Sequence, residues 1–446
     1  MTNTRTPSDI DALANKYFHA DLALSPEAAT VVGTDDADHG ALSDYSPAGV
    51  DEQRSLISGT LAKLNSLPIT DDVDRITVAA MNERLGLELE LIDSGERCGE
   101  INVISSPIQG VRDIFDLMPT ETEADWDDIN RRLGVVAEAL EGYKESLRQR
   151  IASGPAIPAR QIERCAEQCE GAAGSASPFL HLVNKRPEVA ANADSARVAY
   201  GQLAEFLRQT ALPTAVEEDA VGRERYSLFS RHFLGADIDL DETYEWGKAE
   251  LAGIVAEQER IARELYGPGV GVREAMERLD SDPKRKLSGV EALRSWMQET
   301  ADASVDAMSQ HFDIPEPLRT IECCLAPSGT GIIYYTGPTG DFSRPGRMWW
   351  SVPSGVTEFA TWKEKTTVYH EGVPGHHLQI GLATYMRDSL NDWRRSGCWV
   401  SGHGEGWALY AEQLMAELGY MDELGDRMGV LDSMRLRTSR VVVDLG

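Results

Sequence analysis

The chain has 446 residues, of which 42% are hydrophobic, and its formal net charge is −30. A chain of this length is expected to fold as two or three lobes or as one large helical domain. The acid excess repels nucleic acids and anionic membranes, which excludes both as partners. No apolar run reaches the length of a membrane span, and the N-terminal residues lack the apolar core of a signal peptide. A cytoplasmic protein is therefore expected.

The six cysteines and the excess of acidic residues each have an ordinary explanation. Six cysteines in a chain of this length, without a secretion signal, favour reduced thiols over a disulfide framework. Cys165 and Cys169 lie one helical turn apart, which is typical of a buried stripe. The acidic residues are spread along the chain, which favours a solubility adaptation, such as one to high salt, over recognition of a basic substrate.

Helical periodicity dominates residues 1–320, which we expect to form one helical region. Ser8 or Asp9 can cap the first helix, and Asp239 or Asp241 can cap a long helix further on. Helices are expected at 8–23, from Ser25 onward, 48–93, 120–153, 189–212, 239–265 and 272–311. The range 48–93 is expected to contain two helices.

Two stretches of this region allow more specific predictions. Thr120 and Glu123 match a capping box at the start of the helix over 120–153. Residues 102–119 are apolar but contain Pro107 and Gly110, which indicates a buried irregular crossing.

The pattern changes at Ile321, where glycine, proline and aromatic residues replace the helical period. Two strands, Gly331–Thr336 and Arg347–Val352, are expected to pair through a polar turn. Residues 321–446 therefore form a second region, with this strand insert followed by histidine-rich helices. The fold class predicted is mainly α with a small antiparallel β insert.

The histidine-rich segment runs from Thr366 to Glu412. It contains four of the nine histidines and three glutamates, namely His370, His376, His377, His403, Glu371, Glu405 and Glu412. Imidazole and carboxylate groups on helices are what a catalytic zinc site uses, with three protein ligands and one position left open for water. The segment therefore predicts a zinc centre.

The spacing departs from the common zinc-peptidase pattern His-Glu-x-x-His, in which both histidines share one helix face. The fourth residue after His370 is Pro374, and in an unbroken helix His376 would point roughly 240° away from His370. Pro374 removes a backbone donor, and Gly375 accepts unusual dihedral angles. We therefore expect a bulged or re-started helix between Glu371 and His376 that brings the two histidines together.

The third ligand is expected from a separate helix that begins near Gly404. Glu405 and Glu412 are seven residues apart, which places them on one stripe about 10 Å apart along the helix axis. Glu405, in the first turn, is the preferred ligand because that position is easily exposed to a cleft. Glu412 is the alternative ligand, or else it orients a liganding histidine.

At these residues the sequence resembles a known family. HEGVPGHHLQ followed by GHGEGWALYAE is similar to the domain of unknown function 885 (DUF885) family, which is grouped with gluzincin-type zinc metallopeptidases that use two histidines and a glutamate. The likeness extends over nearly the whole chain, through LSPEAATVVGTDD, LSDYSP, YYTGPTGDFSRPGRMWW and RLRTSRVVVDLG.

The resemblance implies a large helical cradle around a deep cleft and a bound Zn²⁺. By resemblance His370, His376 and Glu405 would hold the zinc, and Glu371 would activate water. His377 carries less weight because the family pattern places its histidine directly after Pro-Gly. Family members continue beyond RVVVDLG, so a chain that stops at Gly446 is expected to lack the family's C-terminal end.

The activity expected is that of a zinc metallopeptidase, of carboxypeptidase or oligopeptidase type, that hydrolyses short peptides with Glu371 as general base. Four side chains are candidates for stabilising the oxyanion: His403, Tyr334, Tyr335 and Tyr410. Arg344 and Arg435 are candidates for pairing with a substrate carboxylate. Aromatic packing is the alternative role for the tyrosines, and structural pairing for either arginine.

Two other interpretations stay open at this point. The protein could be a non-catalytic helical metal-binding or interaction protein in which the histidine cluster is structural. It could also be a zinc hydrolase that acts on amides or esters other than peptides. The sequence allows a homo-oligomer and does not identify the substrate.

Overall fold

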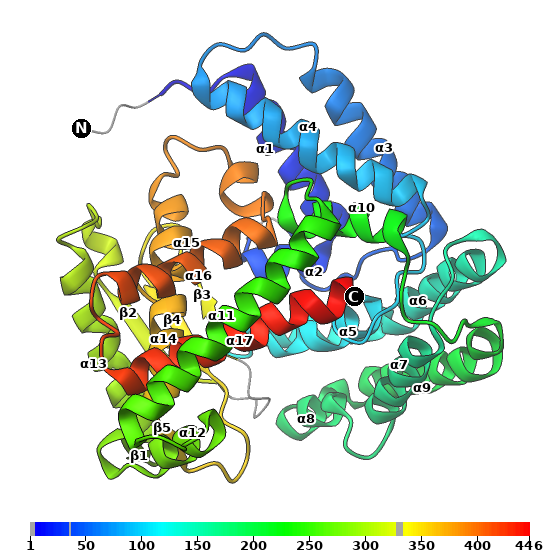
Figure 1. Cartoon of the computed structure of the whole chain (residues 1–446). Coiled ribbons are helices and arrows are strands. Elements are labelled where there is room, and N and C mark those ends of the chain that lie inside the picture. Colours follow the sequence, from blue (N-terminus) through cyan, green and yellow to red (C-terminus); the bar gives the residue numbers. More distant parts are fainter. Residues whose placement is uncertain (1–4, 35–36, 327–332) are drawn as a thin grey trace. The chain divides into compact units, whose positions relative to one another are not determined.

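The structure is a computed structural model that describes residues 5–34, 37–326 and 333–446 (Figure 1). It is mainly helical, with short strands between residues 286 and 360, which confirms the predicted fold class. Contacts divide the described chain into two compact units. Unit 1 contains Phe229–Leu390 and Trp399–Gly446, and unit 2 contains Arg5–Leu228 and Asn391–Cys398. These boundaries differ from the expected division at residue 320.

Unit 2 is built from helices. They are α1 (Asp9–Leu24), α2 (Pro26–Val32), α3 (Pro47–Leu64), α4 (Asp72–Asp93), α5 (Pro107–Asp113), α6 (Glu123–Ser153), α7 (Ala159–Ala173), α8 (Pro178–Lys185) and α9 (Ala190–Phe206). One core is shared by α1, α3 and α4, and another by α6, α7 and α9. Cys165 and Cys169 are buried in the second core, and the cysteines are free thiols, as predicted.

Two local predictions in unit 2 are wrong. The capping box of α6 uses Thr122 and Asp125 in place of Thr120 and Glu123. Thr120 lies outside the helix, where its carbonyl accepts a hydrogen bond from the indole nitrogen of the buried Trp126. The stretch 102–119 is not irregular throughout, because it contains the helix α5. Pro107 is the first residue of α5, and proline is tolerated there because the first N–H group of a helix has no partner within the helix.

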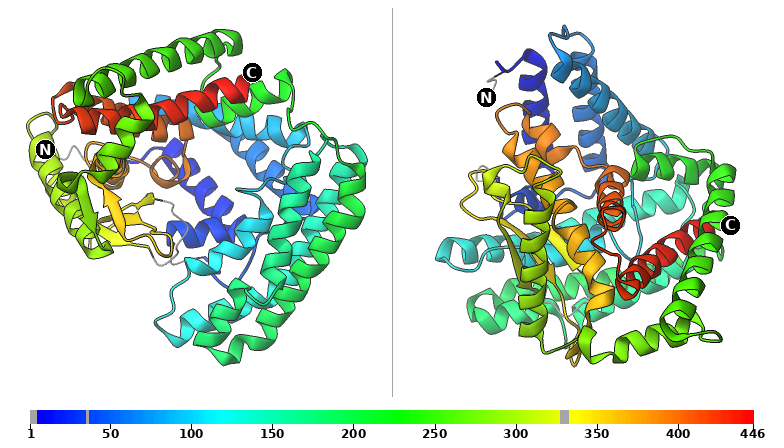
Figure 2. Two further views of the ribbon diagram at one scale, coloured as in Figure 1. Left: turned by 60° about the horizontal axis from the view of Figure 1, so that its bottom comes forward. Right: turned by 60° about the vertical axis from the view of Figure 1, so that its left-hand side comes forward.

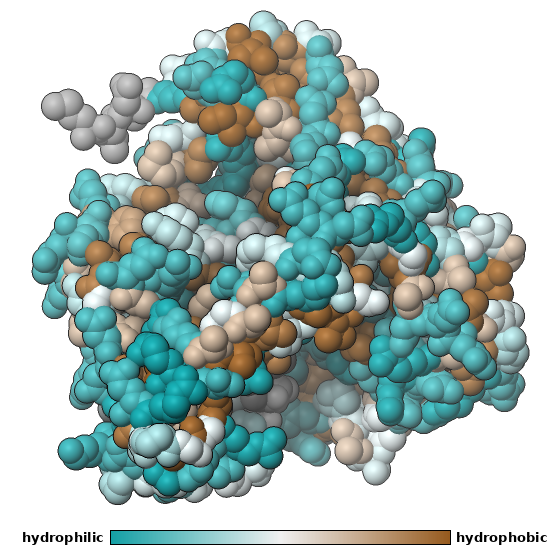
Figure 3. Space-filling view, viewed as in Figure 1, coloured by the Kyte–Doolittle hydropathy of each residue, from teal (hydrophilic) through white to brown (hydrophobic). Residues whose placement is uncertain are grey.

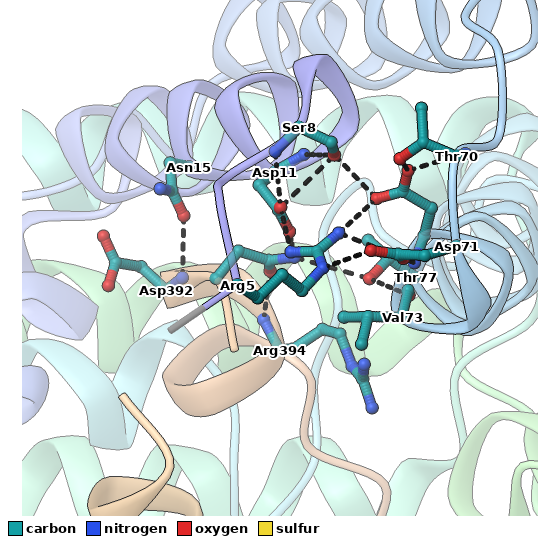
Figure 4. Close-up of polar contacts among 12 residues, drawn as sticks. Arg5, Ser8, Asp11, Asn15, Thr70, Asp71, Val73, Thr77, Asp392 and Arg394 are labelled. Carbon is teal, nitrogen blue, oxygen red and sulfur yellow. Dashed lines mark hydrogen bonds and ion pairs between the residues drawn. The ribbon is translucent and has the colours of Figure 1, made fainter. Parts of the chain in front are cut away.

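The N-terminal part of unit 2 is fixed by a polar cluster (Figure 4). The Arg5 guanidinium pairs with Asp71 and Asp74, each at 2.6 Å, and also with Asp11. Ser8 caps α1 and donates to the same Asp74 at 2.6 Å. Because Asp11 and Asp74 are buried, this cation compensates charges that would otherwise be costly to bury.

The segment Asn391–Cys398 lies in unit 2 although it connects two helices of unit 1. The Asn391 amide donates to Asp11 at 3.0 Å, and the backbone N–H of Asp392 donates to Asn15 at 2.7 Å (Figure 4). Trp393 is buried in the core with α1. The chain therefore leaves unit 1 after Leu390 and returns to it at Trp399.

Unit 1 carries the histidine-rich segment. Its helices are α11 (Leu240–Tyr266), α12 (Val272–Ser281), α13 (Val290–Met308), α14 (Thr361–Glu371), α15 (His376–Tyr385), α16 (Ser401–Glu417) and α17 (Leu424–Leu445), and α10 (Arg223–Leu234) spans the boundary. Asp239 caps α11, which is one of the two caps predicted. Helices α11 and α17 lie side by side (Figures 1 and 2), and α14 packs against α13, α16 and α17.

A three-stranded sheet precedes α14. Its strands β2 (Ile321–Leu325), β3 (Ile333–Thr336) and β4 (Gly346–Trp350) are ordered β2-β4-β3. The antiparallel pairing of β3 with β4 confirms the predicted insert, although residues 331–332 of the expected first strand lie outside the described residues. The sequence did not predict β2, which pairs in parallel with β4, or the short antiparallel pair of β1 (Lys286–Ser288) and β5 (Glu358–Ala360).

In the described part of the chain, no helix combines the length and the apolar composition that a membrane crossing requires. Hydrophilic residues are spread over the face seen in Figure 3 and are not gathered in one block.

Candidate metal centre

The helix that carries His370 stops at Glu371, and a new helix starts at His376. The intervening turn contains the cis peptide bond between Val373 and Pro374. The expected re-start between Glu371 and His376 is therefore present. Its effect is that the His370 and His376 rings stand edge to face, with their centroids 4.9 Å apart.

Gly375 makes this tight turn possible. Its N–H donates to the carbonyl of Tyr369 at 3.2 Å, so the backbone folds back onto the last turn of α14. A Cβ atom at position 375 would collide with the carbonyl oxygen of His370. The turn therefore requires glycine because of a close backbone approach.

Three side chains converge at this point. The Nε2 atom of His370 lies 3.4 Å from one carboxylate oxygen of Glu405, and the Nε2 atom of His376 lies 3.7 Å from the other. One potential ligand atom from each of the three residues lies within 4.8 Å of the others. Two imidazole nitrogens and one carboxylate oxygen are a donor set that suits zinc. Helix α16 starts at Ser401, earlier than the expected Gly404, and Glu405 lies in its second turn with its side chain 53% exposed.

The other ring nitrogen of His370, Nδ1, contacts a second glutamate. Its Nδ1 atom lies 2.8 Å from Glu412, which is buried on α16. Glu412 also accepts a hydrogen bond from Thr366 and pairs with Arg437 at 3.1 Å. An imidazole whose far nitrogen faces a carboxylate has its orientation fixed and its remaining nitrogen directed toward a ligand. Glu412 therefore occupies the orienting position that was its alternative role.

The electrostatics of the site favour positive charge at His370. Burial alone would lower the pKa of His370, but hydrogen bonds to Glu405 and Glu412 raise it to about 9. The hydrogen bond from His370 lowers the pKa of Glu405 below its usual value. Burial, with the nearby His370, lowers the pKa of His376. Two carboxylates facing one imidazole thus stabilise positive charge at this point.

Glu371 follows the first histidine directly and is buried. Burial raises the pKa of its carboxyl group to about 7. Its Oε2 atom and the Nδ1 atom of His376 are both buried without a hydrogen-bond partner within the described chain. Buried polar atoms without a partner are costly, and they cluster where a ligand or an ion is expected. The residues present therefore fit a metal ion with an adjacent proton acceptor.

His377, which directly follows His376, has a structural role. Its Nε2 atom lies 2.9 Å from the carbonyl oxygen of Leu318, and its Nδ1 atom lies 2.8 Å from the hydroxyl of Tyr335. Burial lowers the pKa of His377 to about 4, so the ring is neutral and bridges α15 to β3. Both ring nitrogens and the Tyr335 hydroxyl are occupied by these contacts.

His403 and Tyr410 lie on α16 and are both exposed. The ring of His403 is near the amide of Gln379, with 3.5 Å between the two nitrogens. Tyr410 packs against Trp407, with the ring centroids 5.9 Å apart. Gln379 lies on α15 one helical turn after His376, so His403 contacts α15 next to the centre, whereas Tyr410 has an aromatic contact of its own.

The remaining candidates have partners elsewhere in unit 1. Tyr334 stacks on Trp349 in the sheet. Arg344 donates to the carbonyl of Gly337 at 2.9 Å and so closes its own loop. Arg435 donates to Gln258 at 3.0 Å. These contacts match the alternative roles, which were aromatic packing for Tyr334 and structural pairing for Arg344 and Arg435.

Sequence reasoning missed four residues around the centre. Thr366 lies one turn before His370 on the same helix face, a spacing that could have identified it. Arg437 lies 25 residues beyond Glu412, and no local pattern joins the two. Trp407 donates to the carbonyl of Pro374 at 2.8 Å and so holds the turn, and the ring of Trp399 lies beside that of His376.

The family model described as "Bacterial protein of unknown function (DUF885)" matches residues 26–446. The chain belongs to the DUF885 family. No curated protein matches the sequence significantly.

Two solved structures show the same fold as this DUF885 member. One is described as a "putative lipoprotein from Colwellia psychrerythraea", with a TM-score of 0.83 and 21% sequence identity. The other is a "putative lipoprotein of unknown function from Shewanella oneidensis", with a TM-score of 0.70 and 16% identity. Each match covers 98% of this chain and 83% of the other chain. At these identities the likeness concerns the fold alone.

Proposed function

We propose that this DUF885 protein is a zinc-dependent peptidase that hydrolyses short peptides. The observation that carries the proposal is the convergence of His370, His376 and Glu405 within 4.8 Å, beside a buried glutamate. Separate helices supply these ligands, and the turn that aligns them is sterically specific to glycine. Two buried polar atoms at the centre, one from Glu371 and one from His376, have no hydrogen-bond partner within the described chain, which leaves room for an ion or a ligand there.

Each residue of the centre has a defined task in this proposal. A zinc ion held there supplies a Lewis acid and lowers the pKa of a water molecule that it binds. His370 and His376 would hold the ion through ring nitrogens, His370 losing a proton when the ion binds, and Glu412 fixes the orientation of His370. The Oε2 atom of Glu371 accepts a proton from the attacking water and then donates it to the leaving amine. Burial of its carboxyl group raises the pKa of Glu371 above the usual value, which favours a group that can both accept and donate a proton.

The proposal is tested by elemental analysis of the purified protein together with a peptide-library digest, run with and without a chelator. The expected result is about one zinc ion per chain and cleavage that the chelator abolishes and added zinc restores. His376→Ala should lose both the metal and the cleavage. Zinc without peptide cleavage would contradict the peptidase and favour a non-catalytic metal protein, and cleavage of small esters alone would favour a hydrolase of other substrates.

The cellular location of the protein is a separate question. The cytoplasmic location expected from the N-terminal residues is not confirmed. The two similar structures are described as lipoproteins, a class attached to the cell envelope, and this argues for an envelope location of this chain as well. Fractionation of the native host, with detection of the full-length protein, distinguishes the two locations.

A further inference from the structure

Trp399 borders the candidate metal centre with an exposed aromatic ring. It is the residue at which the chain re-enters unit 1, just before α16. Its centroid lies 6.4 Å from that of the His376 ring, with the planes inclined at 51°. Yet the residue is 54% exposed, which is unusual for an indole so close to a buried histidine.

The position of this ring is fixed by the first turns of α16. A Cβ atom at Gly404 would collide with two atoms of the six-membered ring of Trp399. The six-membered ring of the indole therefore lies in close contact with α16 at Gly404, directly before the ligand Glu405. The ring thus lies beside the two elements that supply ligands, while about half of the residue remains exposed to solvent.

We infer that Trp399 forms an apolar wall of the substrate site and selects peptides with a large apolar side chain beside the cleaved bond. This inference rests on the proposed peptidase function. A substrate whose carbonyl group reaches the metal centre places its neighbouring side chains within a few ångströms of the ligands. An anchored indole recognises aromatic and aliphatic side chains by burying their surface, and aromatic pairs add a further preference.

The chain offers a matched control for this residue. Trp246, on α11, is 55% exposed, so its replacement removes an equally exposed indole. We compare wild type, Trp399→Ala, Trp399→Phe and Trp246→Ala, each loaded with zinc and checked for metal content. The probes are the best-cleaved peptide from the library and a copy in which alanine replaces the apolar residue beside the cleaved bond.

The wild-type protein should prefer the apolar peptide. Trp399→Ala should lower kcat/KM for that peptide about tenfold or more and change kcat/KM for the alanine peptide by less than about twofold. Trp399→Phe should keep most of the preference, and Trp246→Ala should match wild type. Zinc content should be the same in all four proteins.

Two kinds of failure are distinguishable. If the zinc-loaded wild type cleaves no peptide, the proposed function fails and this inference fails with it. If it cleaves peptides without an apolar preference, or if Trp399→Ala lowers both rates equally, only the role of Trp399 is overturned.

Discussion

At the scale of single residues, the sharpest test concerns Glu371. Glu371→Gln keeps the size of the side chain but removes its ability to accept a proton. We expect hydrolysis to fall by about 10²- to 10⁴-fold, with zinc content unchanged. Glu364→Gln is the matched control, because burial also raises the pKa of Glu364 to about 7, on the same helix but seven residues earlier. Full activity in Glu371→Gln would remove the general-base role.

Glu364 also gives a prediction about stability. Burial raises the pKa of its carboxyl group from 4.5 to about 7, so between these pH values the folded protein holds a proton that the unfolded chain has released. The free energy of unfolding contributed by this group therefore falls as the pH rises through that window. Replacing Glu364 by Gln should stabilise the protein at pH 8 by up to about 3 kcal/mol, and the gain should shrink toward zero at pH 5. Denaturant unfolding at the two pH values measures the difference, and an equal effect at both would contradict it.

Glu412 supports the metal centre without being one of the three proposed ligands. Glu412→Gln removes the charge that faces both His370 and Arg437, and it should weaken zinc binding by about 10- to 100-fold. The control is Glu417→Gln, which changes an exposed residue near the end of the same helix. Competition with a chelating dye gives the zinc Kd of each variant. An unchanged Kd in Glu412→Gln would show that the buried carboxylate serves stability alone.

At the scale of elements, the local sequence predicted the helix break at Pro374 and Gly375 but not the contacts that distant elements make around it. Pro374 and Gly375 violate the helical pattern inside a histidine motif, and that conflict is readable because it is local. The pairing of Arg437 with Glu412 cannot be predicted in this way, since it depends on how α17 packs against α14 and α16. For the same reason β2 was missed, because its five residues gain their strand character from pairing with β4.

The turn itself can be tested through Gly375. Gly375→Ala places a methyl group against the carbonyl oxygen of His370, so the turn must open and His376 must move away from His370. We expect zinc binding to weaken by at least tenfold, because a ligand displaced by about 1 Å no longer fits the ion. Gly253→Ala, on α11, is the control, since a Cβ atom there meets only open space. Equal zinc affinity in the two variants would mean that the turn does not set the position of His376.

At the scale of the whole molecule, the chain passes through unit 2 between two helices that carry proposed ligands of the metal centre. The segment Asn391–Cys398 belongs to unit 2, yet its ends continue into the helices that carry His376 and Glu405. Sequence reasoning placed all residues after 320 in one region, because a short segment that leaves a unit and returns has no compositional signature. The geometry of two ligands is thus expected to depend on how firmly unit 2 holds this segment.

A pair of tryptophan variants separates this coupling from general destabilisation. Trp393 is 3% exposed in the core that contains α1, and Trp126 is 8% exposed in the other core of unit 2. Replacing either by Ala leaves a cavity and should lower the free energy of unfolding by about 3–5 kcal/mol. Only Trp393→Ala should also weaken zinc binding under conditions where both variants are folded, because only that cavity loosens the segment between α15 and α16. If calorimetry gives the same zinc Kd for both variants, unit 1 holds the centre on its own, and the return of the chain through unit 2 serves folding alone.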